Sequence, residues 1–404
     1  MINFVEMKNR IAMCSALVLM SLAAGAQNKV TSDYDAYLNE REQALHNYKK
    51  RSEEGQQKIA EDWARYQLVS ENDYQKYLAA ETARYEEFRR RVIACWGEEN
   101  YAEDGPKRLV EYSEDYQSRS DVDFENGTVE IEVLAKVDEK PEVVEDKLKE
   151  AVKDLMELRI DDEQAPVLEG QMEKRKYNLD EEAVSADLAD KIVAEEDKTS
   201  KVVETDEGEM QIVTVKVKLA ENHISTRAAK FKDIIHRNSV RFSIDEPLLY
   251  AVIEQESAFN PRAKSPVPAY GLMQLVPKSG GREAFRHVHK KDIIPLPAYL
   301  YVPENNVELG TGYLHRLMTV VFAGVKDPDC RMLCAVAAYN TGPGNVSRAM
   351  TGGTAVSKAV SVINMMTYDR LYEHLRTQLP YAETRDYIQK VTSKRRKYMD
   401  TQAK

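Results

Sequence analysis

The sequence predicts a mainly α-helical protein, and three observations lead to this fold class. From His223 onward, apolar residues recur at helical spacing between loops that contain proline and glycine. Alternation of apolar and polar residues, which is typical of strands, is clearest within residues 95–222. Residues 31–92 are highly charged and nearly free of proline and glycine. We therefore expect a long helical N-terminal extension, a small α+β domain and an all-α C-terminal domain.

Residues 1–26 are predicted to be an export signal. Lys8 and Arg10 precede the apolar run IAMCSALVLMSLAAGA, and Ala24-Gly25-Ala26 provides the small residues of a cleavage site. The run is short and rich in small residues for a membrane span, and an uncleaved anchor is the alternative. We expect an exported protein of the periplasm or cell envelope.

The extension over residues 27–94 is predicted to form one or two long helices. Its aromatic and apolar residues follow one helical face together with one glutamate, and this face comprises Tyr74, Tyr77, Leu78, Glu81, Tyr85, Phe88 and Val92. Such a face would allow self-association or the docking of an envelope partner. The alternative is a helical arm that has no fixed partner.

The domain over residues 95–222 is predicted from strands that surround a helix. In VDFENGTVEIEVLAK, apolar residues alternate on both sides of Asn126-Gly127, which predicts a β-hairpin with a type I′ turn. EDKLKEAVKDLMELR follows as an amphipathic helix, and MQIVTVKVKL follows as another strand. The acidic stretch from Asp161 to Asp206 has no clear pattern, and we expect a mobile loop there.

The domain over residues 223–404 is predicted to consist of helices joined by long loops. The expected helices are Ser225–Phe242, Pro247–Phe259, Asn305–Phe322, Pro328–Asn340, Gly344–Met350 and a last helix from Ala382. This domain carries 26 Lys and Arg against 16 Asp and Glu, a net charge of +10. Since the whole chain has a net charge of −11, residues 1–222 carry −21.

The basic C-terminal domain favours a polyanion or a carboxylate-bearing polymer as its partner. Nucleic acid is disfavoured, because the chain has neither an aromatic-basic motif nor a glycine loop for phosphates. His287 and His289 lie two residues apart with no further ligand nearby, which indicates a solvated loop and no metal site. No cofactor is expected.

Cysteine usage predicts no disulfide framework. Without the signal segment the chain keeps Cys95, Cys330 and Cys334, which are too few for a disulfide scaffold. We expect Cys334 to pack in a core, and a bridge between Cys330 and Cys334 would strain a helix.

One glutamate interrupts the apolar stripe of the helix in LLYAVIEQESAFNP. The stripe consists of Leu248, Leu249, Val252 and Ile253, and Glu256 occupies its next position. Glu254 lies about 200° around the helix axis from Glu256, so we expect it to point away from the stripe into solvent. Apolar neighbours should raise the pKa of Glu256, which suits a general acid. The alternative is a glutamate that reaches water at the helix end or pairs with Arg262.

The segment ESAFNPRAKSPVPAYGLMQLVP resembles the catalytic domain of the lytic murein transglycosylases, a family related to goose-type lysozyme. The matching residues are Glu256-Ser257, Asn260-Pro261, Ser265 and Gly271-Leu272-Met273-Gln274. PENNVELGTGYLHRL, AYNTGPG and ETRDYIQKV follow in the order of the family. The resemblance implies that the all-α domain is lysozyme-like.

The resemblance extends upstream of this domain. GPKRLVEYSEDYQSRSDVDFENGTVEIEVLA is similar to the N-terminal domain of the transglycosylase C branch, and QIVTVKVKLAENHISTRAAKF to its domain junction. It therefore covers the chain from about Cys95 to the end.

The sequence departs from the pattern of the family in two places. Pro268 replaces a glycine of the family and restricts the loop before Gly271. The branch consists of lipoproteins, but Ile11-Ala12-Met13 before Cys14 is a poor lipobox, so we expect no lipid anchor.

The resemblance implies an enzyme that cleaves the β-1,4 bond between N-acetylmuramic acid and N-acetylglucosamine in peptidoglycan strands. In this family the 6-hydroxyl of the muramic acid attacks its own anomeric carbon and leaves a 1,6-anhydro end. One carboxyl group then serves first as acid and later as base. Ordinary glycosidases use two carboxylates. Two alternatives remain, a hydrolytic muramidase and a non-catalytic scaffold that binds peptidoglycan.

Site residues are carried over by position from the resemblance. Glu256 is the acid and base, and Tyr387 hydrogen-bonds it and holds its rotamer. Ser265 and Gln274 would hydrogen-bond the substrate, Met273 would pack on a sugar ring, and Tyr339 and Asn340 would flank the bond. For Met273 and Tyr387 the alternative is a role in core packing. Independently of the family, Tyr339 and Asn340 precede Gly342-Pro343-Gly344, which predicts a helix end opening into a loop.

Overall fold

The computed structural model describes residues 68–69, 71–159, 165–180, 183–206 and 208–402. The chain divides into two compact units. Of the described residues, the first unit comprises 72–104 and 108–226, and the second comprises 68–71, 105–107 and 227–402 apart from the gaps given above. The predicted signal and most of the predicted extension lie outside the described residues. Within the described ranges, every helix is too short or too polar to cross a membrane.

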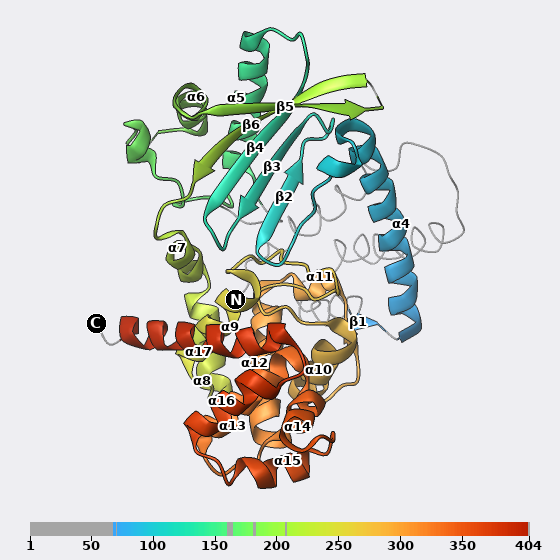
Figure 1. Cartoon of the computed structure of the whole chain (residues 1–404), viewed down its shortest axis with the longest axis vertical. Coiled ribbons are helices and arrows are strands. Elements are labelled where there is room, and N and C mark those ends of the chain that lie inside the picture. The colour runs from blue at the N-terminus through green and yellow to red at the C-terminus, as the bar shows by residue number, and fades with distance from the viewer. Residues whose placement is uncertain (1–67, 70, 160–164, 181–182, 207, 403–404) are drawn as a thin grey trace, which may run out of the picture. The chain divides into compact units, whose positions relative to one another are not determined.

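The first unit is built on an antiparallel five-stranded sheet in the order β2-β3-β4-β6-β5 (Figure 1). The strands are β2 (Arg108–Tyr112), β3 (Ser118–Asp123), β4 (Thr128–Lys136), β5 (Lys198–Thr205) and β6 (Gly208–Lys218). Helix α5 (Pro141–Glu157) packs on β3 and β4. Alternate residues Val129, Ile131 and Val133 are fully buried, as their pattern predicts for a strand with one covered face.

The predicted hairpin is confirmed, but its turn is not of type I′. Asp123 pairs with Thr128, so the loop has four residues, and only Gly127 among them has a positive φ, of 65°. The Asp123 carboxylate accepts hydrogen bonds from the backbone amides of Glu125 and Asn126, both at 2.9 Å. This side-chain cap favours a longer loop over a two-residue turn that needs positive φ at both centres.

The prediction of a mobile loop over Asp161–Asp206 is wrong for most of its described residues. They form the 3-10 helix η3 (Lys174–Tyr177), helix α6 (Ser185–Glu195) and strand β5. Helix α6 packs on α5 and buries Leu188, Ala189, Ile192 and Val193. Their spacing is helical, but the helix has only 11 residues, which is too short for a clear periodic pattern.

Helix α4 (Glu71–Trp96) forms most of the described part of the predicted extension, and η2 (Glu98–Asn100) follows it. Its C-terminal part packs within the first unit. Val92 and Trp96 are fully buried in a cluster with Leu134 and Ile212. This section of the predicted arm is therefore part of a core, while self-association through the extension stays a prediction.

The second unit is helical apart from β1 (Leu68–Val69) and β7 (Ile294–Pro295), two short strands that pair antiparallel. The helices predicted from the sequence are α7 (His223–Lys230), α8 (Lys232–Phe242), α9 (Glu246–Ser257), α12 (Pro303–Arg316), α13 (Pro328–Thr341), α14 (Pro343–Thr351) and α17 (Ala382–Gln402). The first of the predicted helices is interrupted at Phe231, and the helix expected to reach Phe322 ends in the π-helical turn η5 (Leu317–Val321).

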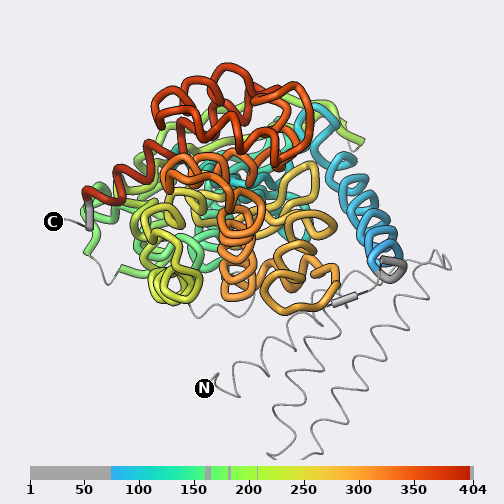
Figure 2. The backbone as a smooth tube through the Cα atoms, turned by 90° about the horizontal axis from the view of Figure 1, so that it is seen from below, coloured from blue at the N-terminus to red at the C-terminus, as the bar shows by residue number. Residues whose placement is uncertain are grey.

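Several short elements of the second unit are additional to the prediction. They are the π-helical turn η4 (Pro277–Gly281) and helices α10 (Arg282–His289), α11 (Pro297–Leu300), α15 (Val356–Ile363) and α16 (Tyr368–Gln378). Each is too short for a clear periodic pattern. In Figure 2 the C-terminal helix α17 runs in red along one side of the chain. The predicted all-α class is confirmed.

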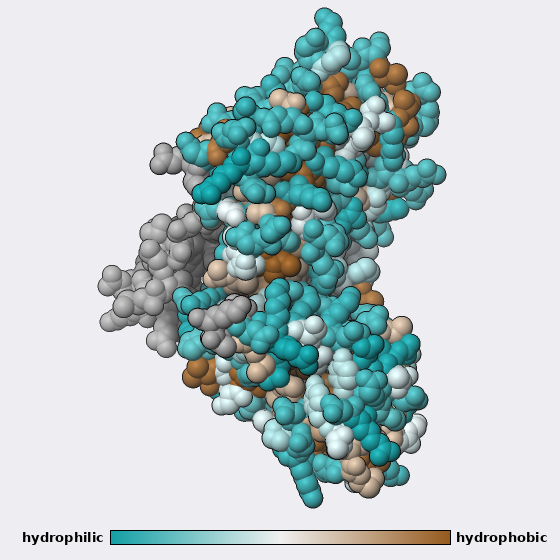
Figure 3. Space-filling model, turned by 60° about the vertical axis from the view of Figure 1, so that its left-hand side comes forward, coloured by the Kyte–Doolittle hydropathy of each residue, from teal (hydrophilic) through white to brown (hydrophobic). Residues whose placement is uncertain are grey.

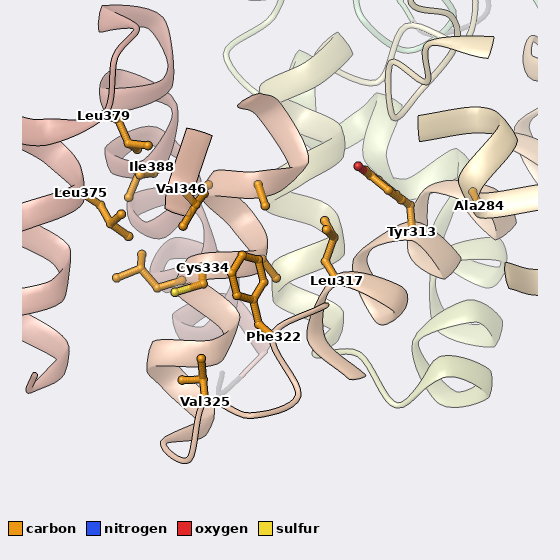
Figure 4. Packing of buried hydrophobic residues seen from close by; sticks show 14 of the residues in the cluster. Ala284, Tyr313, Leu317, Phe322, Val325, Cys334, Val346, Leu375, Leu379 and Ile388 are labelled. Atoms are coloured by element: carbon orange, nitrogen blue, oxygen red, sulfur yellow. The ribbon is translucent and has the colours of Figure 1, made fainter. Parts of the chain in front are cut away.

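The core of the second unit contains the apolar faces of helices α12 to α17. Phe322, Cys334 and Val346 lie together in it, and Leu375 and Ile388 join them from α16 and α17 (Figure 4). Cys334 is a free thiol with no exposed surface, so it packs as a small apolar residue. The face of the molecule seen in Figure 3 is mostly hydrophilic, with apolar residues in small patches.

Candidate active site

Helix α9 carries Glu256 in its last turn. The Asp245 carboxylate caps the N-terminus of the helix and accepts a hydrogen bond from the amide of Leu248 at 3.1 Å. The helix stops abruptly because Ala258 and Phe259 have positive φ values of 49° and 63°. Two successive non-glycine residues in this region store strain, which is a frequent feature beside functional sites.

Glu256 accepts a hydrogen bond on its Oε1 from the hydroxyl of Tyr387, at 2.6 Å. The side chain keeps a partly exposed edge, while its carboxyl group lies within dense protein. Burial raises the pKa of Glu256 to about 7, against the opposing effects of the Tyr387 hydrogen bond and the charge of Lys107. The charge of Glu383 adds to the rise. Near neutral pH the group is therefore present in both protonation states.

Two neutral tyrosines lie within reach of the charge of Glu256, and one of them, Tyr387, donates a hydrogen bond to it. Burial and the charge of Glu256 raise the pKa of Tyr339 and of Tyr387 well above the usual range. The hydroxyl of Tyr339 donates to the backbone oxygen of Met273 at 2.7 Å. Tyr339 lies near the end of α13 and Tyr387 in α17, so three helices meet at Glu256.

The GLMQ loop is held by a buried asparagine. The Asn306 Oδ1 accepts a hydrogen bond from the amide of Met273 at 2.7 Å, and its Nδ2 donates to the carbonyls of Tyr270 at 2.8 Å and Leu300 at 2.7 Å. Gly271, with φ of 75°, lies against the same groups, because a Cβ there would stand 2.3 Å from the Leu300 oxygen. Only glycine fits this position.

Met273 has no exposed surface. It packs so closely on α12 that a Cβ at Gly310 would lie 2.4 Å from its sulfur. Contact between Met273 and a sugar ring would therefore require its neighbours to move. In this structure Met273 fills the core below the loop and contributes its backbone carbonyl to Tyr339.

Gln274 has an acceptor that no described residue satisfies. Its Nε2 donates to the carbonyls of Ala263 and Gly271, both at 3.0 Å, which fixes the orientation of the amide. Its Oε1 is buried and has no hydrogen-bond partner within the described ranges. Buried polar atoms are almost always satisfied, so this oxygen is suited to a donor from a bound ligand.

Ser265 hydrogen-bonds within its own loop. Its hydroxyl donates to the carbonyl of Val267 and accepts from the amide of Ala269 at 3.1 Å. These bonds close a tight turn around Pro268, so Ser265 would have to release them to bind a substrate. Val267, at the tip of this turn, is 74% exposed.

Asn340 joins the end of α13 to α17. Its Oδ1 accepts a hydrogen bond at 2.7 Å from the hydroxyl of Thr384, a residue that is 1% exposed. Gly342, with φ of 83°, then ends α13. Tyr339 and Asn340 thus lie at a helix end, as the glycines after them predict. The predicted loop is absent, because α14 begins at Pro343 and only Gly342 separates the two helices.

Three positioning residues of the site have no assigned role in the sequence analysis. They are Ser257, whose hydroxyl donates to the carbonyl of Leu272 at 2.8 Å, together with Asn306 and Thr384. Each is a small polar residue that the fold buries. All three lie inside the motifs that match the family, and that placement is the signal that could have identified them.

The prediction that Glu254 points into solvent is wrong. Glu254 is 5% exposed, with its Oε1 2.9 Å from the Lys394 Nζ, and its Oε2 accepts a hydrogen bond from the hydroxyl of Tyr398. The helical spacing separates Glu254 from Glu256 as expected. However, α17 covers the second face of α9, which the pattern of α9 alone cannot reveal.

Other polar features lie apart from this site. His287 Nε2 is 2.9 Å from His315 Nδ1, but nowhere in the described ranges do three or more metal-binding side chains form a group that could hold an ion. An open hollow of about 360 Å³ lies on the first unit and has no residue of the site in its lining. Its lining residues are Gln117, Lys136, Val137, Asp138, Glu139, Lys147, Glu209 and Met210.

Comparison with known proteins matches each of the two units to a domain of lytic murein transglycosylases. Residues 233–360 match the Transglycosylase SLT domain, and residues 74–230 match the membrane-bound lytic murein transglycosylase C, N-terminal domain. The chain is 31% identical to membrane-bound lytic murein transglycosylase C of Klebsiella pneumoniae subsp. pneumoniae, over 77% of this chain and 87% of that protein. The protein of the same name from Photorhabdus laumondii is 32% identical, over 77% and 88% of the two chains.

A solved structure is also similar over part of the chain. It is an inactive mutant of lytic transglycosylase Slt from Pseudomonas aeruginosa, at 29% identity and a TM-score of 0.33. The match covers 43% of this chain and spans only 24% of that larger protein.

Proposed function

Because the chain belongs to the family of membrane-bound lytic murein transglycosylase C, we propose that it cleaves peptidoglycan strands with Glu256 as its single catalytic carboxyl group. Membership makes the chain a lytic murein transglycosylase, an enzyme that acts on murein. The proposal concerns the bond, the product and the residues. The bond is the β-1,4 link from N-acetylmuramic acid to N-acetylglucosamine, and the product has a 1,6-anhydro end.

In the first step Glu256 acts as an acid. Its protonated carboxyl group donates a proton to the glycosidic oxygen, and the bond from this oxygen to the anomeric carbon breaks with its electron pair leaving on oxygen. The N-acetylglucosamine side departs with a new hydroxyl group. Positive charge develops on the muramic acid ring, and the carboxylate that remains at Glu256 stabilises this charge.

In the second step Glu256 acts as a base. Its carboxylate takes the proton of the 6-hydroxyl of the same muramic acid, and the oxygen forms a bond to the anomeric carbon. The 1,6-anhydro ring closes, Glu256 is protonated again, and no water is consumed. A pKa of about 7 serves both steps, since neither protonation state of the group is costly near neutral pH.

The observation that carries the proposal is the contrast between two neighbouring carboxyl groups. Glu256 has a raised pKa and one tyrosine donor, whereas Glu254 is committed to Lys394 and Tyr398. Hydrolysis by the usual route needs a second free carboxylate beside the bond. Glu254 does not provide it, and this favours attack by the substrate's own hydroxyl.

Product analysis tests this proposal. Purified sacculi are digested with the protein, and the new ends of the released muropeptides are identified by mass spectrometry. We expect 1,6-anhydro-muramic acid ends, which are lighter than reducing ends by one water. Reducing, hydrated ends would identify a hydrolytic muramidase and refute the single-carboxyl mechanism.

Tyr387→Phe is expected to change the pH profile of cleavage as well as the rate. The lost hydrogen bond stabilised the carboxylate, so the pKa of Glu256 rises further, and the decline of kcat/KM on the alkaline side moves to higher pH. Loss of rotamer control should lower kcat by about tenfold. Initial rates on soluble glycan strands between pH 5 and pH 9 measure both effects. An unchanged profile would mean that Tyr387 does not act on the acid.

The site of action that we propose is the cell envelope, where peptidoglycan lies. The relatives from Klebsiella pneumoniae and Photorhabdus laumondii are named as membrane-bound, which supports an envelope location for them. The predicted export signal agrees with this location, although it lies outside the described residues. Fractionation of cells that produce the full chain, with the mature N-terminus sequenced, tests the proposal.

A further inference from the structure

The second carboxylate of α9 is part of a buried polar cluster that the proposed reaction does not use. Glu254 contacts Lys394 and Tyr398, both from α17, and the charge of Arg227 on α7 acts on the same carboxylate and on Tyr398. Burial alone would raise the pKa of Glu254, but the charge of Lys394 and the hydrogen bonds from Tyr398 and Lys394 hold it below its usual value. Lys397 acts in the same direction. Glu254 is therefore an anion in the folded protein.

The residue that contacts Glu256 comes from the same helix as this cluster. Tyr387, Val391, Lys394 and Tyr398 follow one another at spacings of four, three and four residues, which places them on one face of α17. Tyr387 and Tyr398 stand about three turns, or about 16 Å, apart along it. The ends of this face reach the two carboxylates of α9, Tyr387 at Glu256 and Tyr398 at Glu254.

The contact between the two helices is extended further along α9. Tyr398 stacks on Tyr250, with ring centroids 5.1 Å apart and planes at 29°. Arg395 Nε lies 2.7 Å from Oδ2 of Asp245, the residue that caps α9. Figure 1 shows α17 crossing α9, and their contact is the most extensive between any two described helices.

A buried ion pair is a poor way to gain stability but an effective way to specify register. Removing Glu254 and Lys394 from water costs free energy that apolar residues would not cost. In return, the pair is satisfied in only one axial alignment, as for a buried polar residue in a coiled coil. A slip of α17 by one residue would shift it about 1.5 Å and rotate it about 100°, which would take Tyr387 out of reach of Glu256.

We propose that Glu254, Lys394 and Tyr398 are positioning residues that lock the register of α17 on α9 and so keep the Tyr387 hydroxyl on Glu256. This inference rests on the proposed role of Glu256. Lys394 and Tyr398 contact Glu254, and the hydrogen bond to Glu256 comes from Tyr387. The effect of the cluster on the reaction passes through Tyr387, and that dependence makes it testable.

The experiment compares Tyr398→Phe, Tyr387→Phe and the double variant in the full chain. Tyr398→Phe removes one hydroxyl and keeps the ring on Tyr250. We expect it to lower kcat on soluble glycan strands by about tenfold, to change KM less, and to move the alkaline limb of the pH profile upward as Tyr387→Phe does. In the double variant the second change should add little, because both act through one hydrogen bond.

Arg395→Gln is the matched control. It removes an ion pair between the same two helices that lies outside the buried cluster, so it should leave the pH profile unchanged. If Tyr398→Phe loses cooperative unfolding, Lys394→Met tests the same register, since it keeps the length of the side chain without the charge. Additive effects in the double variant, or a pH profile that shifts equally in Arg395→Gln, would overturn the proposal.

A Glu256→Gln variant in the same series separates the two levels of inference. If Glu256→Gln is inactive and Tyr398→Phe retains the parent profile, the register lock fails and the proposed function stands. If Glu256→Gln is as active as the parent, the proposed function itself fails, and the register lock fails with it.

Discussion

Glu256→Gln is expected to lower the rate of glycan cleavage by about a thousandfold. Glutamine keeps the size and the contact with Tyr387, but it can neither give a proton to the glycosidic oxygen nor take one from the 6-hydroxyl. Both proposed steps therefore fail together. Release of soluble muropeptides from sacculi, followed over time, measures the loss.

The folded state of Glu256→Gln should be intact or more stable, which separates a catalytic loss from misfolding. The pKa of Glu256 is about 7 in the folded protein and close to 4.5 in the unfolded chain. The folded state binds the proton more tightly, so this group favours folding most below about pH 4.5 and loses that contribution as the pH rises to about 7. At pH 8 the variant should unfold at the same or a higher temperature than the parent.

Glu383→Gln is the matched control for charge near the site. Glu383 is exposed in the first turn of α17 and acts on Glu256 only through its charge. Its loss should lower the pKa of Glu256 slightly, and the variant should retain most of the activity.

If instead Glu256→Gln cleaved at the parent rate, the assignment of the acid would be wrong. Retained glycan binding without turnover in the parent would favour the scaffold alternative.

Gly271→Ala is expected to have the largest effect on stability. The added Cβ would stand 2.3 Å from the Leu300 carbonyl oxygen and 2.3 Å from the Asn306 Nδ2, and φ at this position is 75°. The backbone oxygen cannot move without breaking its bond to Asn306. We expect a loss of about 3 kcal/mol or more in the free energy of unfolding, from strain and overpacking together.

Gly353→Ala is the control for this change. Gly353 has open space around its Cβ position, and its φ lies outside the left-handed region. Urea unfolding of both variants should show a large fall in midpoint for Gly271→Ala only. The activity of Gly271→Ala should fall as well, because the loop also fixes the Met273 carbonyl and Gln274. Equal midpoints for the two variants would contradict the packing of the GLMQ loop.

The sequence predicted the elements whose patterns are local. The β3–β4 hairpin, α5, β6 and most helices of the second unit follow from apolar spacing and from glycine and proline. Local features also explain two errors of the prediction. The turn of the hairpin differs because the Asp123 side chain caps it. Helix α6 was missed because it is short and its apolar spacing covers only two turns.

The candidate site likewise has features that the sequence predicted and features that it did not. The position of Glu256 on an apolar stripe predicted a raised pKa, and the matched motifs suggested Tyr387 as its partner. Other features depend on which backbone groups come together, and no pattern of residues reveals that. They are the burial of Met273 below the loop, the closure of the Ser265 turn, and the Gln274 acceptor, which has no partner among the described residues.

Helix periodicity by itself determined that Glu254 and Glu256 point in different directions from α9. Only the tertiary structure decided what lies in each direction. Tyr387, Lys394 and Tyr398 all come from α17, more than a hundred residues further along the chain. A helix pattern reports which of its own faces is apolar. Whether a carboxylate on another face meets water or a buried lysine depends on long-range packing.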